Sequence, residues 1–224
     1  MQFVWGSRLM SDMGAAQSFR QSPIGNRPIV AFDFDGTLTI RDSFTAFLRQ
    51  RAGVGRWAIG LARMAPALAA YVGDRDRGRI KAASVREFLG GVERPTLETE
   101  AEAFCADIWE RFMRPDALAC WNAWGDTGAH RVIVTASPET TVAPFARRLG
   151  AEGLLGTQLA FDSRDRVTGA FAGENCRGEE KVRRLRTAYG DDMTLAAAYG
   201  DTSGDTEMIA IAKEKGFRVF TGRP

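Results

Sequence analysis

The sequence contains few cysteines and no large excess of charge of either sign. Its three cysteines, Cys105, Cys120 and Cys176, are odd in number and lack metal-ligand spacing, which argues against a disulfide framework and a zinc site. A reducing cytoplasm is therefore the expected location. The formal net charge of +2 is small and the basic residues are spread along the chain, so a nucleic acid is not an expected partner.

Long hydrophobic runs are also missing. Residues 1–27 lack the apolar centre of a signal peptide and contain Gly, Ser, Gln and Pro, so we interpret them as a flexible N-terminal tail. An apolar helical segment, residues 54–71, is rich in alanine and includes Arg56, Arg63 and Pro66. Because a transmembrane helix needs about 20 strongly apolar residues, this segment is not expected to span a membrane.

What the sequence does contain is a regular alternation of short apolar runs and helical patterns from Pro28 onward, over most of its 224 residues. This alternation predicts an α/β fold, with a parallel sheet covered by helices on both faces. We expect strands at residues 29–34, 131–135, 195–199 and 217–220, helices at 139–149 and 204–215, and a β-hairpin formed by 154–161 and 166–171.

Residues 41–113 break the alternation and are predicted to be helical, with helix starts near Asp42 and after Pro95. We interpret them as a helical cap inserted into a core of residues 28–40 and 114–224. Apolar cap residues recur at spacings of three and four, and Pro66 should kink this stripe. We expect the stripe to pack inside the cap; the alternative is a helix lying on a membrane surface. The stripe consists of Val54, Trp57, Leu61, Met64, Leu68 and Tyr71.

Two carboxylates follow the first predicted strand, in the order Asp33-Phe34-Asp35-Gly36-Thr37. Because residues i and i+2 of an extended segment point to the same side, Asp33 and Asp35 should face one small volume. Such a pair can supply a covalent nucleophile and a proton shuttle, with a divalent cation to reduce repulsion of an anionic substrate. Taken alone, the motif fits a solvated Asp-Gly turn equally well.

Three further elements stand at predicted strand ends or helix starts. Thr135 and Ser137 precede a helix, where hydroxyl and backbone N–H groups can bind phosphate; the alternative is a plain helix cap. Lys181 begins a helix and can neutralise a phosphate, or else be a solvated surface residue. Asp201 and Asp205 flank a glycine-bearing loop and can share a cation; the alternative is a capped helix start.

The four elements, in this order, resemble the motifs of the haloacid dehalogenase superfamily of phosphohydrolases. The resemblance implies a Rossmann-like core, and the inserted helical cap resembles that of the subfamily that includes phosphoserine phosphatases. By this similarity, Asp33 attacks phosphorus to give a phosphoaspartyl intermediate, and Asp35 protonates the leaving group and then activates water. Thr135 would hold a phosphate oxygen, and Lys181 would stabilise charge on the transferring group.

The resemblance also implies a Mg²⁺ cofactor and a set of binding residues. The ion would be held by Asp33, the backbone carbonyl of Asp35, and Asp201, with Asp205 in support. Substrate and phosphate contacts would come from Gly36, Thr37, Asp42, Ala136 and Ser137. Asp35 favours the hydrolysis of phosphate esters, since dehalogenation has no alcohol leaving group to protonate.

Two details depart from phosphoserine phosphatases. Thr135 is not followed by two glycines, and Asp42 stands where those enzymes carry a glutamate for the substrate amine. Segments around Asp42, Thr135 and Lys181, with the apolar first cap segment, are similar to the phosphatidylglycerophosphatase C type. An apolar cap beside a basic run would suit an acyl chain and an anionic headgroup; the alternative is a basic, solvated surface. The basic run consists of Arg75, Arg77, Arg79 and Lys81.

The sequence therefore predicts a phosphomonoester hydrolase that acts on a small phosphorylated metabolite or on a phospholipid headgroup, such as that of phosphatidylglycerophosphate. A peripheral membrane contact through the cap is one option. The alternatives are a phosphoserine phosphatase, a phosphotransferase or mutase that passes the phosphoryl group to an acceptor other than water, and a non-catalytic regulator that binds a phosphorylated ligand.

Overall fold

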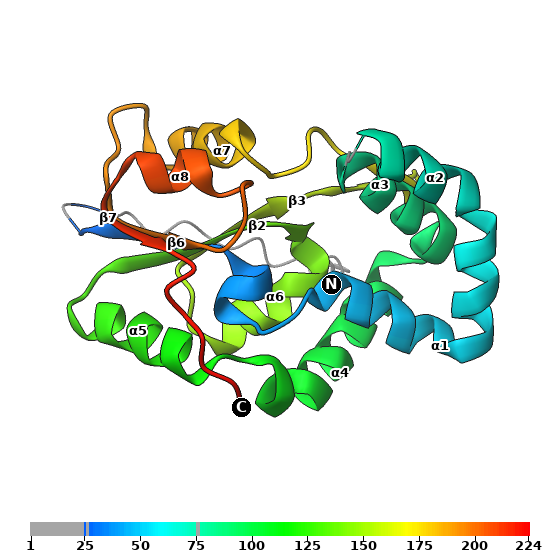
Figure 1. Ribbon diagram of the computed structural model, residues 1–224, viewed down its shortest axis with the longest axis horizontal. Helices are drawn as coiled ribbons and strands as arrows, with labels where there is room; N and C mark the ends of the chain where they lie inside the picture. The colour runs from blue at the N-terminus through cyan, green and yellow to red at the C-terminus, as the bar shows by residue number, and fades with distance from the viewer. Residues whose placement is uncertain (1–24, 26, 75–76) are drawn as a thin grey trace, which may run out of the picture.

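The computed structural model describes residues 25, 27–74 and 77–224 (Figure 1), so the predicted N-terminal tail lies almost entirely outside the described residues. The centre of the fold is a five-stranded parallel sheet in the order β3-β2-β1-β6-β7. The predicted α/β class with a parallel, Rossmann-like sheet is therefore confirmed. The strands of this sheet are β1 Ile29–Phe32, β2 His130–Pro138, β3 Gly153–Thr157, β6 Leu195–Gly200 and β7 Ala212–Phe217.

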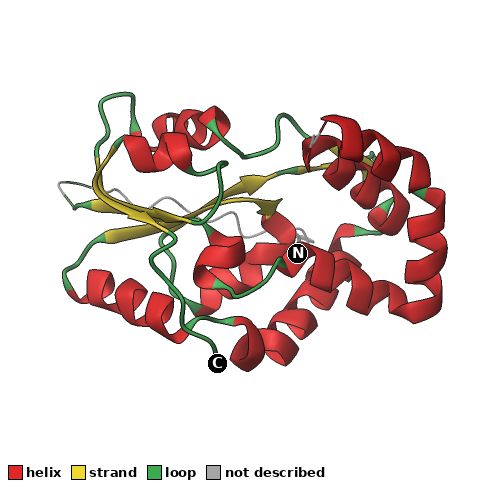
Figure 2. Cartoon of the chain, in the orientation of Figure 1, coloured by secondary structure: helices red, strands yellow, loops and turns green. Residues whose placement is uncertain are grey.

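Helices cover both faces of the sheet, with α5 and α6 on one side and α7 and α8 on the other (Figures 1 and 2). Alternation along β1 divides the core between the two faces. Val30 and Phe32 belong to one hydrophobic cluster, and Ile29 and Ala31 to the other. These four helices are α5 Pro115–Asp126, α6 Glu139–Arg148, α7 Glu179–Tyr189 and α8 Thr206–Ala210.

Within the described residues, five α-helices lie between β1 and β2. We call the first four the cap; they occupy the right of Figure 1, whereas the fifth, α5, covers the sheet. The first begins after Asp42, whose side chain accepts a hydrogen bond from the backbone N–H of Thr45 at 2.6 Å. It ends before Met64, close to the kink predicted at Pro66. The cap helices are α1 Ser43–Arg63, α2 Ala65–Asp74, α3 Arg77–Leu89 and α4 Arg94–Phe112.

The end of the chain differs from the prediction. The helix expected over residues 204–215 stops at Ala210, and the strand expected at 217–220 is instead β7, which ends at Phe217. The sequence of β7 contains lysine and glutamate, which favour helices, but propensity is weak and pairing with β6 outweighs it. Gly216 suits this pairing, because a Cβ atom there would overlap the ring of Tyr199.

The predicted β-hairpin is correct only in part. Residues 153–157 form β3, which pairs with β2 in the main sheet, whereas β4 (Leu159–Phe161) pairs in antiparallel fashion with β5 (Val167–Phe171). An apolar run shows that a segment is extended but does not say which strand it joins. For that reason the single long strand expected at 154–161 proved to be two short ones.

The apolar stripe of the cap is interrupted at Val54, which is 82% exposed, so its expected packing there is wrong. Val54 follows Gly53, whose φ of +68° kinks α1. An added Cβ atom at Gly53 or Gly55 would meet nothing within 4 Å, so this turn projects into open space beyond the neighbouring helices. Of the other stripe residues, Leu61 is 36% exposed and the rest are buried or partly buried, and all five border the cavity described next.

Candidate active site

The predicted catalytic residues gather at the carboxyl ends of three adjacent strands. Asp33 follows β1, Thr135 lies near the end of β2, and Asp201 follows β6. The strand order changes direction at β1, and open α/β sheets bind their ligands at such a point. A cavity of about 650 Å³ lies here between the core and the cap, and all three residues border it.

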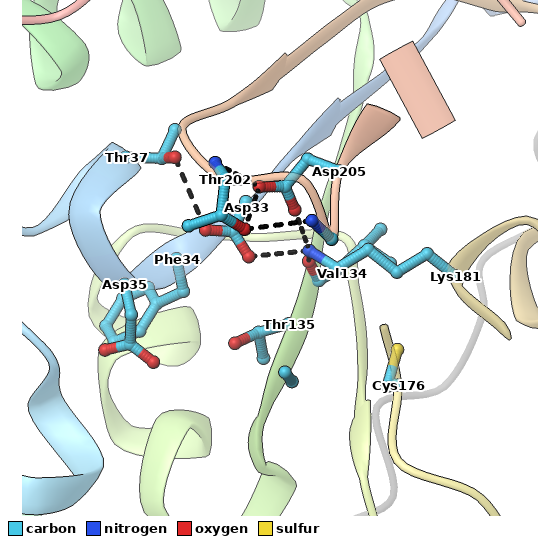
Figure 3. Close-up of polar contacts among 12 residues, drawn as sticks. Asp33, Phe34, Asp35, Thr37, Val134, Thr135, Cys176, Lys181, Thr202 and Asp205 are labelled. Carbon is cyan, nitrogen blue, oxygen red and sulfur yellow. Dashed lines mark hydrogen bonds and ion pairs between the residues drawn. The ribbon is translucent and has the colours of Figure 1, made fainter. Parts of the chain in front are cut away.

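Lys181 is a buried cation held between carboxylates. Its Nζ atom donates to Asp33 Oδ1, Asp205 Oδ1 and the backbone carbonyl of Val134, each at 2.6 Å (Figure 3). An ammonium group has three protons, and these three acceptors satisfy them all. Because the residue is only 1% exposed, the alternative of a solvated surface lysine is wrong.

The pKa values within this cluster reflect two opposing effects: burial disfavours the charged form of each group, and neighbouring opposite charges favour it. Burial lowers the pKa of Lys181, but the carboxylates of Asp33 and Asp205 outweigh that effect and raise it. Burial raises the pKa of Asp33 to about 7, although Lys181 acts in the opposite direction. For Asp205, Lys181 and the Thr202 hydrogen bonds overcome burial and lower the pKa. The ionised form of Asp205 is therefore better supported than that of Asp33.

Asp205 is oriented by the loop that precedes it. Its Oδ2 atom accepts from the backbone N–H groups of Asp201 and Thr202, at 3.2 and 2.9 Å, and from the Thr202 hydroxyl at 3.0 Å. Its side chain makes no capping bond to α8. The alternative of a simple capped helix start therefore does not describe this residue.

Three carboxylates can converge on one cation. One oxygen from each of Asp33, Asp201 and Asp205 lies within 4.8 Å of the others. Among the described residues, Asp201 Oδ1 is buried without a hydrogen-bond partner. Burial raises the pKa of Asp201, and Asp205 adds to the effect. Gly36, at φ +87°, leaves room for the Asp201 carboxylate, which an added Cβ atom would overlap. This all-oxygen, anionic set fits a hard divalent ion such as Mg²⁺.

Asp35 borders the same cavity but lies apart from the carboxylate cluster (Figure 3). The chain does not continue as an extended strand after Asp33 but winds into a turn over Phe34–Leu38, so the expectation that the side chains of Asp33 and Asp35 converge is only partly right. Asp35 accepts from the backbone N–H of Ser43 at 2.6 Å and from the Ser137 hydroxyl. Burial, followed by the charge of Asp42, raises the pKa of Asp35, as a proton donor requires.

The Thr135–Ser137 segment does not cap a helix. Strand β2 runs on to Pro138, and α6 begins at Glu139 without a side-chain capping bond. Instead, the buried Thr135 hydroxyl accepts from the backbone N–H of Ser137 at 3.1 Å, and both Thr135 and Ala136 border the cavity. Thr135 and Ala136 therefore border the same cavity as Asp33 and Asp35, whereas the predicted binding residue Ser137 is buried, does not line the cavity and donates its hydroxyl to Asp35.

The other predicted binding residues divide into two groups. Asp42 caps α1 and borders the cavity, as does Gly36. Thr37 is buried, and its hydroxyl donates to Asp33 Oδ2 at 3.3 Å, so it acts on the carboxylate and does not line the cavity. The Thr37 hydroxyl therefore orients Asp33, and the predicted contact of Thr37 with substrate or phosphate stays a prediction.

Lys81 is a cavity residue that the sequence placed only in a basic run. Its Nζ atom donates to the backbone carbonyl of Ala136 at 2.9 Å, which links α3 of the cap to the end of β2. Burial lowers the pKa of Lys81, while Asp35 and Asp42 act to raise it. Of the remaining basic run, Arg79 is exposed, whereas Arg75 and the side chain of Arg77 lie outside the described residues.

An apolar wall faces the polar end of the cavity. It is built by cap residues, including most of the predicted stripe, and the ring of Trp57 stacks on that of Phe88 at 4.7 Å. Helical spacing of three and four could have identified the wall, but not that it borders the same cavity as Asp33 and Asp35. The wall consists of Phe44, Leu48, Trp57, Leu61, Met64, Leu68, Tyr71 and Ile80.

A parallel sheet, an inserted cap and a site of carboxylates at the strand ends together indicate a hydrolase of the haloacid dehalogenase type. In agreement with this, residues 30–210 match the family of haloacid dehalogenase-like hydrolases. The chain belongs to this family, which confirms the resemblance inferred from its motifs. No helix among the described residues combines the length and apolar character needed to cross a membrane.

The chain is also similar to individual proteins and solved structures. Protein CicA of Caulobacter vibrioides is 56% identical over 202 residues, which cover 90% of each chain. The phosphoserine phosphatase SerB1 of Mycobacterium tuberculosis is 29% identical over 89% of this chain and 67% of its own. A phosphoserine phosphatase solved as an analogue of its phosphoaspartyl intermediate shares the fold, with a TM-score of 0.57 and 19% identity over 84% of this chain and 85% of its own.

Proposed function

We propose that this hydrolase is a Mg²⁺-dependent phosphatase that cleaves phosphomonoesters through a phosphoaspartyl intermediate on Asp33. The observation that carries the proposal is the placement of Asp33 between the buried Lys181 ammonium and the carboxylate pair Asp201 and Asp205. A buried carboxylate in contact with one cation, and beside a site for a second, is suited to attack an anionic phosphorus centre.

The residues divide the first chemical step between them. An Asp33 carboxylate oxygen forms a bond to phosphorus while the ester P–O bond breaks, and Asp35 gives its proton to the departing alkoxide. Asp33 Oδ1 contacts Lys181, whereas Oδ2 receives, among the described residues, only the long hydrogen bond from Thr37 and is the better placed nucleophile. A bound Mg²⁺ ion would neutralise charge on the phosphoryl oxygens and favour ionised Asp33.

The second step regenerates the enzyme. Asp35, now ionised, takes a proton from a water molecule, whose oxygen attacks phosphorus and releases inorganic phosphate from Asp33. Burial is the main cause of the raised pKa of Asp35, which makes its carboxyl group able both to give and to take a proton. Thr135 and the backbone beside it would hold phosphate oxygens during both steps.

The cavity favours a substrate with an apolar part. Its cap side is lined by aromatic and aliphatic side chains, and Lys81 lies where an anionic group can be held. A lipid phosphate such as phosphatidylglycerophosphate combines these features, whereas a small, fully polar phosphomonoester such as phosphoserine would leave the apolar wall exposed to water. We therefore infer that the substrate is a phosphomonoester with an apolar substituent, and that phosphoserine is the alternative that SerB1 suggests.

A lipid substrate would require access to a membrane, and the cap has a surface suited to a peripheral contact. Val54, Ile59 and Val72 are 82%, 53% and 74% exposed on the two helices that also supply most of the apolar wall. In this proposal a cytoplasmic enzyme rests the outer side of α1 and α2 on the bilayer and draws a headgroup into the cavity.

The proposal is tested by measuring phosphate release with Mg²⁺ from phosphoserine, sugar phosphates, nucleotides, lysophosphatidate and phosphatidylglycerophosphate. Wild-type protein should release phosphate, and the Asp33→Asn variant should not. Leu61→Ser should reduce turnover of the lipid substrates selectively, whereas Val219→Ser, which alters an exposed apolar residue outside the cavity, should not. Phosphoryl transfer to an alcohol acceptor without phosphate release would indicate a transferase, and ligand binding without turnover a regulator.

A further inference from the structure

Two arginines outside the cavity hold the backbone on which the proposed cation site stands. Arg114 lies where the chain returns from the cap to the core, and its Nε atom donates to the carbonyls of Gly36 and Thr39 at 3.3 and 3.2 Å. Arg218 follows β7, and its Nε atom donates to the carbonyl of Asp201 at 2.7 Å. Its own backbone N–H donates to Gly200 at 2.9 Å.

The segment after β7 connects these two arginines. Arg114 Nη1 donates to the carbonyl of Gly222 at 3.0 Å. The backbone N–H groups of Thr221 and Gly222 both donate to Asp116 Oδ2 at 2.7 Å. Residues 218–222 therefore run from the loop that carries Asp201 to Arg114 and Asp116, and they are hydrogen-bonded at both ends; Arg114 in turn bonds to the Gly36 carbonyl.

Gly36 and Asp201 face each other directly. A Cβ atom on Gly36 would overlap the Asp201 carboxylate, so the separation of these two backbone segments decides where that carboxylate lies. Arg218 has a φ of +54°, which is a strained backbone conformation for a residue with a side chain. This strained residue is the one whose side chain donates a hydrogen bond to the Asp201 carbonyl.

We propose that Arg114 and Arg218 are positioning residues that set the Asp201 carboxylate at the distance from Asp33 that a divalent cation requires. The inference rests on the proposed function, because it assumes the cation site. It predicts that removal of either arginine weakens cation binding, which is the opposite of what simple electrostatics predicts. Each arginine is a positive charge near the site, so its removal would strengthen cation binding if charge alone mattered.

The test is the dissociation constant of Mg²⁺, measured by isothermal titration calorimetry without substrate, together with the thermal midpoint of the metal-free protein. Arg218→Ala should weaken Mg²⁺ binding by on the order of 10-fold, as loss of groups supporting metal ligands does elsewhere. Its thermal midpoint should remain close to that of wild type, because Arg218 is exposed. Arg218→Lys, which keeps a donor, should recover much of the affinity.

Arg114→Lys serves as the second variant, and Arg223→Ala, an exposed arginine in the same segment, as the matched control that should bind Mg²⁺ like wild type. If Arg218→Ala and Arg114→Lys bind Mg²⁺ as tightly as wild type or more tightly, the inference is wrong while the proposed function stands. If the wild-type protein does not bind Mg²⁺, the metal-dependent function fails, and this inference fails with it.

Discussion

Lys181 Nζ donates to Asp33 Oδ1 at 2.6 Å, and this contact joins the start of α7 to the end of β1 across the floor of the site. Because both groups are buried, the pair is held by the fold before any substrate binds. The ammonium also bonds Asp205 and Val134, so Lys181 has no freedom to turn toward solvent.

Lys181→Met should therefore affect both turnover and stability. Loss of the ammonium should lower kcat on the order of 10²–10³-fold, because the negative charge on the transferring phosphoryl group would no longer be stabilised by a fixed cation. It also leaves two buried carboxylates unpaired, which should reduce the free energy of unfolding by about 3 kcal/mol. Kinetics with Mg²⁺ and urea denaturation measure the two effects. Lys215→Met, at an exposed position, is the control, and an unchanged kcat in Lys181→Met would contradict the assignment.

Gly36→Ala tests the cradle around the Asp201 carboxylate. The added methyl group would force that carboxylate away, so Mg²⁺ binding and phosphate release should both be lost. The matched control is Gly91→Ala, because Gly91 has a similar φ of +80° but open space around it. Both variants carry the same backbone strain, on the order of 1 kcal/mol. Equal loss of Mg²⁺ affinity in the two variants would show that strain, and not the cradle, is responsible.

Lys81→Met tests the cationic residue that the cap brings to the cavity. Lys81 contacts the Ala136 carbonyl and faces the space where substrate would lie, so its loss should raise KM about 10-fold or more, with a smaller effect on kcat. Steady-state kinetics on the preferred phosphomonoester give the two constants separately. Lys213→Met, at an exposed position on β7, should change neither. A fall in kcat with an unchanged KM would instead place Lys81 in the chemical step.

His130 gives a prediction about pH that is independent of the active site, because it is the only histidine of the chain. It is fully buried, and burial lowers its pKa below the model-peptide value of 6.5. The unfolded state therefore binds the proton more readily, and stability should fall as the pH decreases below about 6.5.

One group contributes at most about 1.4 kcal/mol per pH unit to that slope. His130→Gln removes the titration, so urea denaturation at about pH 7.5 and about pH 5.5 should show a smaller acid loss in the variant than in wild type. The difference between the two proteins reports the contribution of His130 to the acid-induced loss of stability, because both proteins contain the same titrating carboxylates. Parallel pH profiles would contradict the prediction.

The sequence was sufficient to predict which site residues lie together, but not which face of the cap packs toward them. Asp33, Thr135, Lys181 and Asp201 stand at strand ends or helix starts, and a parallel sheet brings such positions to one edge whatever the details of its packing. The roles assigned to these residues stay predictions, but their proximity follows from local pattern and chain topology alone. The burial of Lys181 required the structure, since a lysine at a helix start is usually exposed.

The cavity wall could not be predicted, because it depends on how the cap helices pack on the core. The spacing of Trp57, Leu61 and Met64 indicated a shared face but not that this face looks toward Asp33. Lys81 was one of four basic residues with no local feature to distinguish it. Strand β7 was missed for a similar reason, since pairing with β6 overrides the helix preference of its residues.

If the phosphoryl group is transferred first to Asp33, acid-quenched mass spectrometry should detect it on that residue. The protein to use is Asp35→Asn with Mg²⁺ and p-nitrophenyl phosphate, whose good leaving group needs little protonation. Attack by Asp33 should then proceed while hydrolysis of the intermediate is slowed for want of a base. A peptide containing Asp33 should carry one added phosphoryl group, and the Asp33→Asn, Asp35→Asn double variant should carry none. Release of p-nitrophenolate with no modified peptide, or with the phosphoryl group on another residue, would contradict transfer to Asp33.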